Sequence, residues 1–214
     1  SNYVLGKSVN GILTYKYAGV NPETGIYNFT NAKGETGDFL TGLSQSDKTE
    51  FINLDPSYYG GLTNMLSYKN FTLDFSFTFT KRMGKSVMGQ SGLPMGYYGT
   101  NGSTIWLDRW QQPGDVTNVP KVSTSVTNYL SILNFNDSSG AYEDATYARL
   151  QNLSLRYNVA SAFAKKLKLN QLTAYLQGQN LLTISKYGGL DPENLNTTVL
   201  PPMRIFTAGL NVTL

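Results

Sequence analysis

Apolar and polar residues alternate one by one along several stretches of this chain, most clearly from residue 71 to residue 79. The odd positions of that stretch are all apolar, namely Phe71, Leu73, Phe75, Phe77 and Phe79, and the even positions are all polar. Successive side chains of a β-strand point to opposite faces. The stretch therefore predicts a strand with one apolar face and one polar face.

The same alternation, in weaker form, predicts further strands. Together the predicted strands cover residues 8–18, 57–68, 71–82, 144–158, 167–185 and 203–214. In the strand over residues 167–185, Gly178 and Asn180 interrupt the apolar face. In the strand over residues 144–158, the phase of the alternation changes near Gln151 and Asn152, which predicts a β-bulge at that point.

The connections between these strands are long and short in turn. Residues 19–56, 83–143 and 186–202 form long connections, whereas residues 69–70 and 159–166 form short ones. An antiparallel meander would then have tight turns at one end and long loops at the other, which is typical of transmembrane β-barrels. A compact soluble domain rarely contains a connection as long as the one over residues 83–143.

The strand lengths fit a membrane crossing, for which about 9–11 tilted residues suffice. We therefore predict an all-β protein whose apolar strand faces contact lipid and whose polar faces line the barrel lumen. Candidate lumen-facing residues are Asp74, Tyr175, Gln177 and Gln179. About six strands cannot close a barrel of at least eight, and an open edge cannot face lipid, so the chain is predicted to be part of a larger barrel.

Composition supports this picture and excludes several classes of protein. Charged residues make up 14% of the chain, against about 25% in ordinary soluble domains, and aromatic residues make up 13%. There is no His and no Cys, which excludes imidazole catalysis, disulfides and zinc–thiolate sites, so we do not expect an enzyme. The net charge of +3 is too small to indicate nucleic-acid binding. No apolar run is long enough for a membrane-spanning helix, and no signal-peptide pattern opens the chain.

The long connection over residues 83–143 holds the candidate ligand-contact residues. They are Tyr97, Tyr98, Trp106, Asp108, Arg109 and Trp110. Aromatic faces can stack on sugar rings, and Arg and Asp side chains can bond hydroxyl groups or a peptide backbone. An architectural role in the loop, or contact with a partner protein, is the favoured interpretation of these residues.

Carboxylates in two similar turns, Asn21-Pro22-Glu23 and Asp191-Pro192-Glu193, could bind calcium. We favour Pro-initiated turns in which the Asn or Asp side chain caps the backbone. No partner carboxylate can be placed beside Asp74, so this residue is predicted to be a solvated lumen residue. No metal site and no cofactor are predicted.

Segments in several strands and loops resemble, in order, those of the SusC/RagA family of TonB-linked outer-membrane proteins. They cover residues 15–25, 59–64, 68–71, 109–120, 144–155, 178–183, 189–193 and 204–214. The family usually ends in Phe, whereas this chain ends in Leu214. The apolar residues of the last strand would form the assembly signal: Phe206, Leu210, Val212 and Leu214.

The resemblance implies the C-terminal part of a 22-stranded plugged barrel in the outer membrane of a Gram-negative, Bacteroidota-type cell. Such barrels import oligosaccharides or peptides together with a SusD-like surface lipoprotein that acts as a lid. TonB supplies energy through the plug, and not through a segment such as this one. The plug and the signal peptide are expected to belong to a preceding part of the family's chain.

Two other interpretations remain open. One is a TonB-dependent receptor for siderophores or other metal chelates. The other is a small self-contained outer-membrane barrel, such as an adhesin or a porin. Copurification of a SusD-like lipoprotein would distinguish the SusC-like importer from both of these alternatives.

Overall fold

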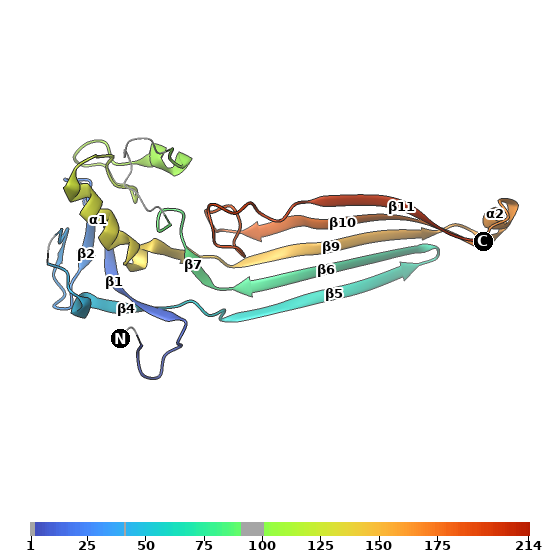
Figure 1. Cartoon of the computed structure of the whole chain (residues 1–214), viewed down its shortest axis with the longest axis horizontal. Coiled ribbons are helices and arrows are strands. Elements are labelled where there is room, and N and C mark those ends of the chain that lie inside the picture. The colour runs from blue at the N-terminus through green and yellow to red at the C-terminus, as the bar shows by residue number, and fades with distance from the viewer. Residues whose placement is uncertain (1–2, 41, 91–100) are drawn as a thin grey trace. The chain divides into compact units, whose positions relative to one another are not determined.

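The computed structural model describes residues 3–40, 42–90 and 101–214, which divide into two compact units (Figure 1). The loop unit comprises Ser1–Asp55, Met83–Asp144 and Leu195–Thr197, and the sheet unit comprises Pro56–Arg82, Ala145–Asn194 and Thr198–Leu214. Among the described residues, no helix combines the length and the apolar character needed to cross a membrane.

The sheet unit is built on one antiparallel sheet with the strand order β11-β10-β9-β6-β5. Its strands are β5 (Tyr58–Tyr68), β6 (Phe71–Lys81), β9 (Tyr147–Asn158), β10 (Gln171–Ser185) and β11 (Ile205–Thr213). A two-residue turn joins β5 to β6, and the short helix α2 (Ser161–Lys166) lies in the connection between β9 and β10. The architecture is the antiparallel all-β segment that the alternation predicts.

The register of the five strands sorts apolar and polar residues onto opposite faces of the sheet. One row of facing residues runs across all five strands, and it consists of Leu66, Leu73, Leu155, Leu176 and Ala208. The neighbouring row on the other face consists of Met65, Asp74, Ser154, Gln177 and Thr207. Because side chains alternate with a period of two, these rows continue as one apolar face and one largely polar face.

The apolar face is exposed in this chain. Leu66, Leu176 and Leu210 are each more than half exposed, and Phe206 is 77% exposed. Contiguous apolar surface of this extent marks a face that contacts protein or lipid rather than water. Phe71, Leu73, Phe75, Phe77 and Phe79 all belong to it, as do the terminal-strand residues Phe206, Leu210 and Val212.

The predicted bulge in β9 is confirmed. The pairing of β9 with β6 shifts after Ser76, so that Asn152 and Leu150 face consecutive residues of β6. The pairing with β10 shifts between Gln179 and Leu182. The shift in β10 also accounts for the interruption at Asn180, which adopts a φ of 52° and whose side-chain amide donates to the carbonyl oxygen of Met203.

The strand predicted over residues 8–18 forms, as β1 (Gly11–Val20), but it does not join the five-stranded sheet. It lies in the loop unit, in a sheet with the order β3-β2-β1-β4. Its partners there are β2 (Tyr27–Thr30) and β4 (Lys48–Asn53), and β3 (Thr36–Gly37) pairs with β2. Strands β2 and β4 lie close to β1 in the sequence, so pairing with them has a small entropic cost of loop closure. The predicted set of about six barrel strands is thereby corrected to the five in the sheet unit.

The long connection over residues 83–143 is also folded. It contains β7 (Met83–Lys85), η2 (Thr104–Asp108), α1 (Val126–Asn136), η3 (Ser139–Ala141) and β8 (Tyr142–Asp144). The remaining short elements of the loop unit are β3 (Thr36–Gly37) and η1 (Gln45–Asp47). Helix α1 packs against β1 and β2 and supplies part of the core of this unit.

An aromatic cluster forms that core. Tyr27 stacks on Phe135 with ring centroids 4.2 Å apart, and Tyr17 meets Phe135 edge-on at 5.4 Å. The backbone amide of Tyr27 donates to the hydroxyl of Ser131 at 3.2 Å. Burial raises the pKa of Tyr17 to about 12 and raises the pKa of Tyr27 well above its ordinary value, so both phenols stay neutral.

Candidate functional site

The polar face of the five-stranded sheet is the first candidate surface. The predicted lumen-facing residues Asp74, Tyr175, Gln177 and Gln179 all lie on it. A groove of about 540 Å³ crosses this face and is lined by residues of all five strands, among them Ser67, Thr72, Arg156, Thr173 and Asn211. Hydroxyl and amide groups dominate this lining, so the groove can donate and accept hydrogen bonds without a strong net charge.

Asp74 is not the solitary solvated carboxylate that the sequence suggested. Its carboxylate oxygen lies 2.6 Å from Nη2 of Arg156, on the adjacent strand β9. Both side chains remain partly exposed, at 26% for Asp74 and 42% for Arg156. The sequence offered no partner for Asp74 because the pairing of β6 with β9 joins residues far apart in the chain.

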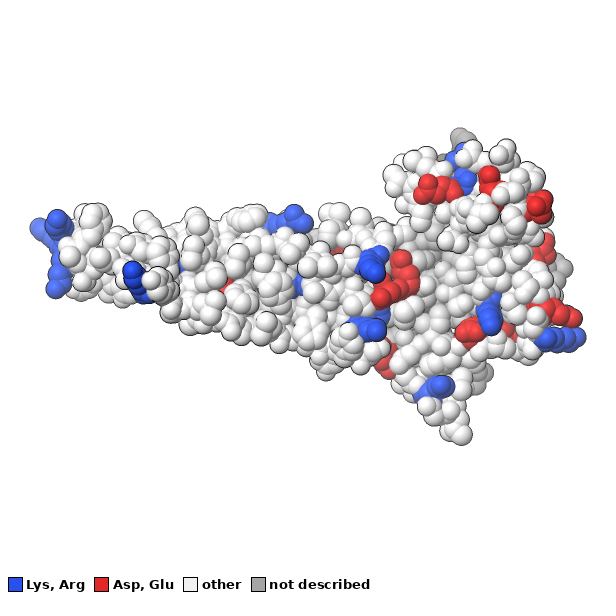
Figure 2. All heavy atoms as spheres, turned by 180° about the vertical axis from the view of Figure 1, so that it is seen from behind, with Lys and Arg blue, Asp and Glu red and all other residues white. Residues whose placement is uncertain are grey.

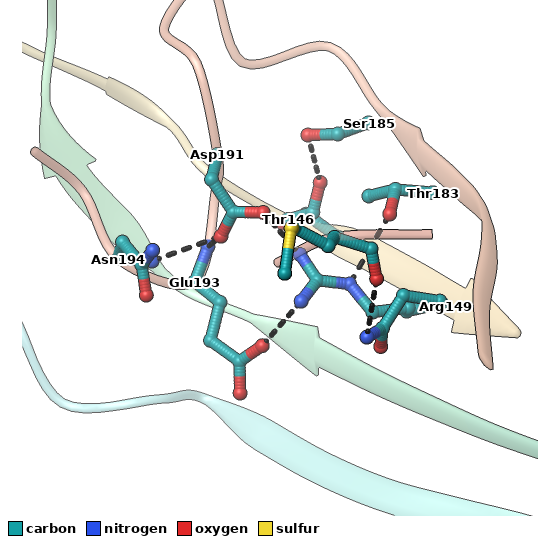
Figure 3. Close-up of polar contacts among 9 residues, drawn as sticks. Thr146, Arg149, Thr183, Ser185, Asp191, Glu193 and Asn194 are labelled. Carbon is teal, nitrogen blue, oxygen red and sulfur yellow. Dashed lines mark hydrogen bonds and ion pairs between the residues drawn. The ribbon is translucent and has the colours of Figure 1, made fainter. Parts of the chain in front are cut away.

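The most buried polar cluster of the sheet unit surrounds Arg149 (Figure 3). Its guanidinium donates to the carboxylates of Asp191 at 2.5 Å and Glu193 at 2.7 Å, and its Nε donates to the Thr183 hydroxyl at 3.1 Å. The side chains of Arg149 and Asp191 are 3% and 4% exposed. Arg149 thus connects β9 and β10 to the loop between β10 and β11.

The carboxylate of Asp191 also orders its own turn. Its other oxygen accepts hydrogen bonds from the backbone amides of Glu193 and Asn194, at 2.9 and 3.0 Å (Figure 3). This is the side-chain-capped turn that the sequence predicts, with the addition of Arg149 as a counter-ion. The guanidinium occupies the place that a cation would need between the two carboxylates.

The matching turn in the loop unit has the same local geometry. The side-chain oxygen of Asn21 accepts from the amides of Glu23 at 2.9 Å and Thr24 at 3.3 Å. The turn interpretation of both segments is therefore confirmed. Within the described residues, no group of three or more acidic side chains is placed to hold a metal ion.

Trp110 packs on that turn. Its indole Nε1 donates to the carbonyl oxygen of Pro22 at 2.7 Å. Gly25, with a φ of 69°, lies under the indole, and a Cβ there would come within 2.5 Å of the ring. The amides of Gly114 and Lys121 add hydrogen bonds to the carbonyls of Pro22 and Gly25, both at 2.9 Å. The geometry supports an architectural role for Trp110.

The other loop candidates do not converge on one site. The Trp106 ring covers Gly102, and the Arg109 guanidinium donates to the carbonyl oxygen of Trp106 at 3.3 Å. Asp108 is exposed, and its carbonyl oxygen accepts from the Thr117 hydroxyl at 2.6 Å. Tyr97 and Tyr98 lie outside the described residues. A role in ligand contact stays a prediction for these residues.

Arg149 and Arg156 are the charged residues of this face that sequence reasoning missed. Each occupies a polar-face position of β9, in the phase that the alternation assigns to the lumen. An arginine in an otherwise uncharged strand face could have indicated a paired carboxylate nearby, because a buried guanidinium needs a counter-charge. The identity of that carboxylate depends on the fold.

Sequence comparison relates nearly the whole chain to TonB-dependent receptors. The chain is 27% identical to TonB-dependent receptor P3 of Formosa agariphila, over 97% of this chain and 22% of the relative. It is 29% identical to TonB-dependent receptor P26 of the same organism, over 84% of this chain and 19% of the relative. No protein-family model matches the chain. The chain spans about a fifth of the length of these relatives.

Structure comparison gives the same relationship for the fold. The chain matches the RagAB peptide importer in its open-open state with a TM-score of 0.70 and 22% identity, over 99% of this chain and 24% of that chain. A second RagAB peptide transporter structure matches with a TM-score of 0.73 and 24% identity, over 94% and 22% of the two chains. The expected resemblance and the expected barrel-segment fold are both confirmed.

Proposed function

We propose that this chain, a segment of a SusC/RagA-type TonB-dependent transporter, forms part of the barrel wall and loops of an outer-membrane importer for oligosaccharides or peptides. The observation that carries the proposal is the match of almost the entire chain to a TonB-dependent receptor. The relatives are named as receptors and importers rather than as enzymes, which fits transport.

The two faces of the sheet unit support a role in the barrel wall. The apolar face, with the phenylalanines of β6, is suited to contact lipid, and the polar face with its neutral groove is suited to line a path for hydrophilic cargo. Hydroxyl and amide groups can exchange hydrogen bonds with a passing sugar or peptide without holding it tightly. In this proposal the chain guides cargo, and the energy-coupled step occurs elsewhere in the transporter.

The long connections that make up the loop unit support a role on the extracellular side of the membrane. The chain passes between the two units just before β5, just after β6, just before β9 and in the connection between β10 and β11. The pairing of Tyr58 with Lys81, of Thr80 with Tyr147 and of Tyr147 with Ser185 brings these points to one end of the sheet. Long loops of transmembrane barrels lie on the extracellular side. We therefore place the contact with a SusD-like lipoprotein in this unit.

The proposal is tested by isolating the intact transporter from outer membranes and measuring uptake in cells that lack or contain TonB. We expect a surface lipoprotein to copurify, and we expect fluorescent oligosaccharides or peptides to enter only when TonB is present. Uptake of an iron chelate without any lipoprotein would instead establish the siderophore receptor. A stable, heat-modifiable monomer formed by these 214 residues alone would establish the small closed barrel.

A further inference from the structure

The short-turn end of the sheet unit carries an isolated group of lysines. Lys69 lies in the turn between β5 and β6, and Lys165, Lys166 and Lys168 lie in or next to α2. The amide of Asn158, just before α2, donates to the carbonyl oxygen of Asn70 at 2.8 Å, so the two connections lie side by side. Figure 2 shows blue side chains at this end of the molecule and no red ones beside them on the face in view.

These lysines have no carboxylate side chain to pair with inside the sheet unit. The acidic side chains of that unit are Asp74, Asp191 and Glu193, and each is bonded to an arginine. Among the described residues, no ion pair involves any of the four lysines. Their charge is therefore available to an external anion.

Helix α2 adds an exposed apolar pair to this basic end. Phe163 is 54% exposed and Leu167 is 52% exposed, whereas Ala164 is buried at 1%. Residues four apart lie on the same side of a helix. Apolar side chains beside lysines on a short surface helix are the pattern of an element that lies in a membrane interface.

The apolar face of the sheet leads directly to this helix. The residues of the apolar face that lie next to the short turns are aromatic: the ring centroids of Phe71 and Tyr157 are 4.7 Å apart. Nζ of Lys69 lies 5.3 Å from the centroid of the Tyr68 ring. Tyrosine and tryptophan rings favour the level of the lipid headgroups. The lysines and the apolar pair of α2 thus come immediately after the residues that would mark the membrane boundary.

We infer that α2 and the turn at Lys69 form a docking surface for anionic phospholipid headgroups of the periplasmic leaflet. The inference rests on the proposed function for the placement of the sheet in a bilayer. Phe163 and Leu167 bury their side chains at the headgroup level, and the four lysines bind lipid phosphates. The surface fixes the depth of this edge of the barrel and enriches anionic lipid around it.

The experiment uses the intact transporter in nanodiscs, with a single bimane fluorophore attached through Ser161→Cys. These 214 residues contain no native cysteine, and any cysteine elsewhere in the transporter is replaced before labelling. We expect brominated phosphatidylglycerol, diluted into phosphatidylcholine, to quench the fluorophore on the order of threefold more than brominated phosphatidylcholine does at the same fraction. The variant K165Q/K166Q/K168Q should abolish this preference.

Matched variants and competitors separate the possible causes. K7Q/K33Q/K186Q removes the same number of charges from exposed lysines elsewhere and should leave the preference intact. Inorganic phosphate at constant ionic strength should not reduce the quenching, because a lipid and not a soluble anion occupies the surface. Loss of quenching with phosphate would overturn the lipid assignment.

A second label, at Leu176→Cys on the apolar face, reports on the proposed function independently. If lipid quenches this label but the Ser161 label shows no preference for phosphatidylglycerol, the docking surface is wrong and the barrel wall stands. If neither label is quenched, the membrane placement itself is wrong. A preference that survives in K165Q/K166Q/K168Q also contradicts the inference.

Discussion

Replacing Arg149 with alanine should release the loop between β10 and β11 from the sheet. The change leaves the Asp191 carboxylate buried at 4% exposure without its counter-ion, and removing one partner of a buried ion pair costs about 3–5 kcal/mol. The equilibrium constant for local opening of residues 187–194 should therefore rise by a factor of about a hundred or more. Hydrogen exchange of the intact protein, followed by mass spectrometry of peptides from this loop, measures the effect.

Two further variants act as controls for this prediction. Arg156→Ala breaks a partly exposed pair with Asp74, which is worth about 0–1 kcal/mol, and should leave the loop protected. Arg149→Lys keeps the charge but loses the forked contact to both carboxylates, so its effect should be intermediate. Unchanged exchange in Arg149→Ala would mean that the Arg149 cluster does not hold the loop.

Introducing arginine at Phe75 should prevent assembly of the barrel, whereas arginine at the next residue, Ser76, should be tolerated. The two residues lie near the middle of β6 and on opposite faces of the sheet. An arginine on the lipid face near the bilayer centre costs about 2–4 kcal/mol, while a lumen position keeps its charge in water. The yield of heat-modifiable protein in outer membranes measures assembly.

The neighbouring strand provides an independent repeat of this comparison. Leu153 pairs with Phe75, and Ser154 pairs with Asp74, so Leu153→Arg and Ser154→Arg place the same charge on the two faces of β9. We expect Leu153→Arg to fail and Ser154→Arg to assemble. Equal yields for both members of each pair, or a lower yield for the serine variants, would mean that the assigned faces are wrong.

The strands of the sheet unit were predictable because one constraint acts on every residue in them. A sheet with one apolar, lipid-facing side and one polar, water-facing side requires apolar and polar residues to alternate along each strand. The strands β5, β6, β9, β10 and β11 all overlap the ranges that this alternation predicts. The constraint is absent in the loop unit. There the adjacent residues Thr14 and Tyr15 of β1 are both buried, so both faces of this strand pack against protein. Alternation in the sequence therefore could not show that β1 lies outside the five-stranded sheet.

The fold of the long connections was not predictable for a related reason. Their core joins Tyr27 and Phe29 to Phe135, which lies about a hundred residues further along the chain. No periodic sequence pattern connects these three residues. The same holds for Trp110, whose indole bonds Pro22 across a separation of 88 residues. Contacts of this kind become visible only when the chain is folded.

The candidate site shows the same division between local and distant chemistry. The turns at Asn21 and Asp191 were predictable because each side chain bonds amides two and three residues further along. The ion pairs of Arg149 with Asp191 and of Arg156 with Asp74 span 42 and 82 residues. The first depends on the fold of the loop after β10, and the second depends on the register of β6 and β9. Sequence could therefore predict the polar face but not the arrangement of charges on it.

The most direct test of the barrel-wall assignment is a nitroxide scan along β6 in the intact protein in lipid bilayers. Labels are placed singly at residues 71 to 80, and collision with oxygen is compared with collision with a water-soluble nickel chelate. We predict a period of two, with the odd positions accessible to oxygen from the lipid and the even positions accessible to the chelate. Uniform access of the chelate to all positions would contradict the assignment of this chain to a barrel wall.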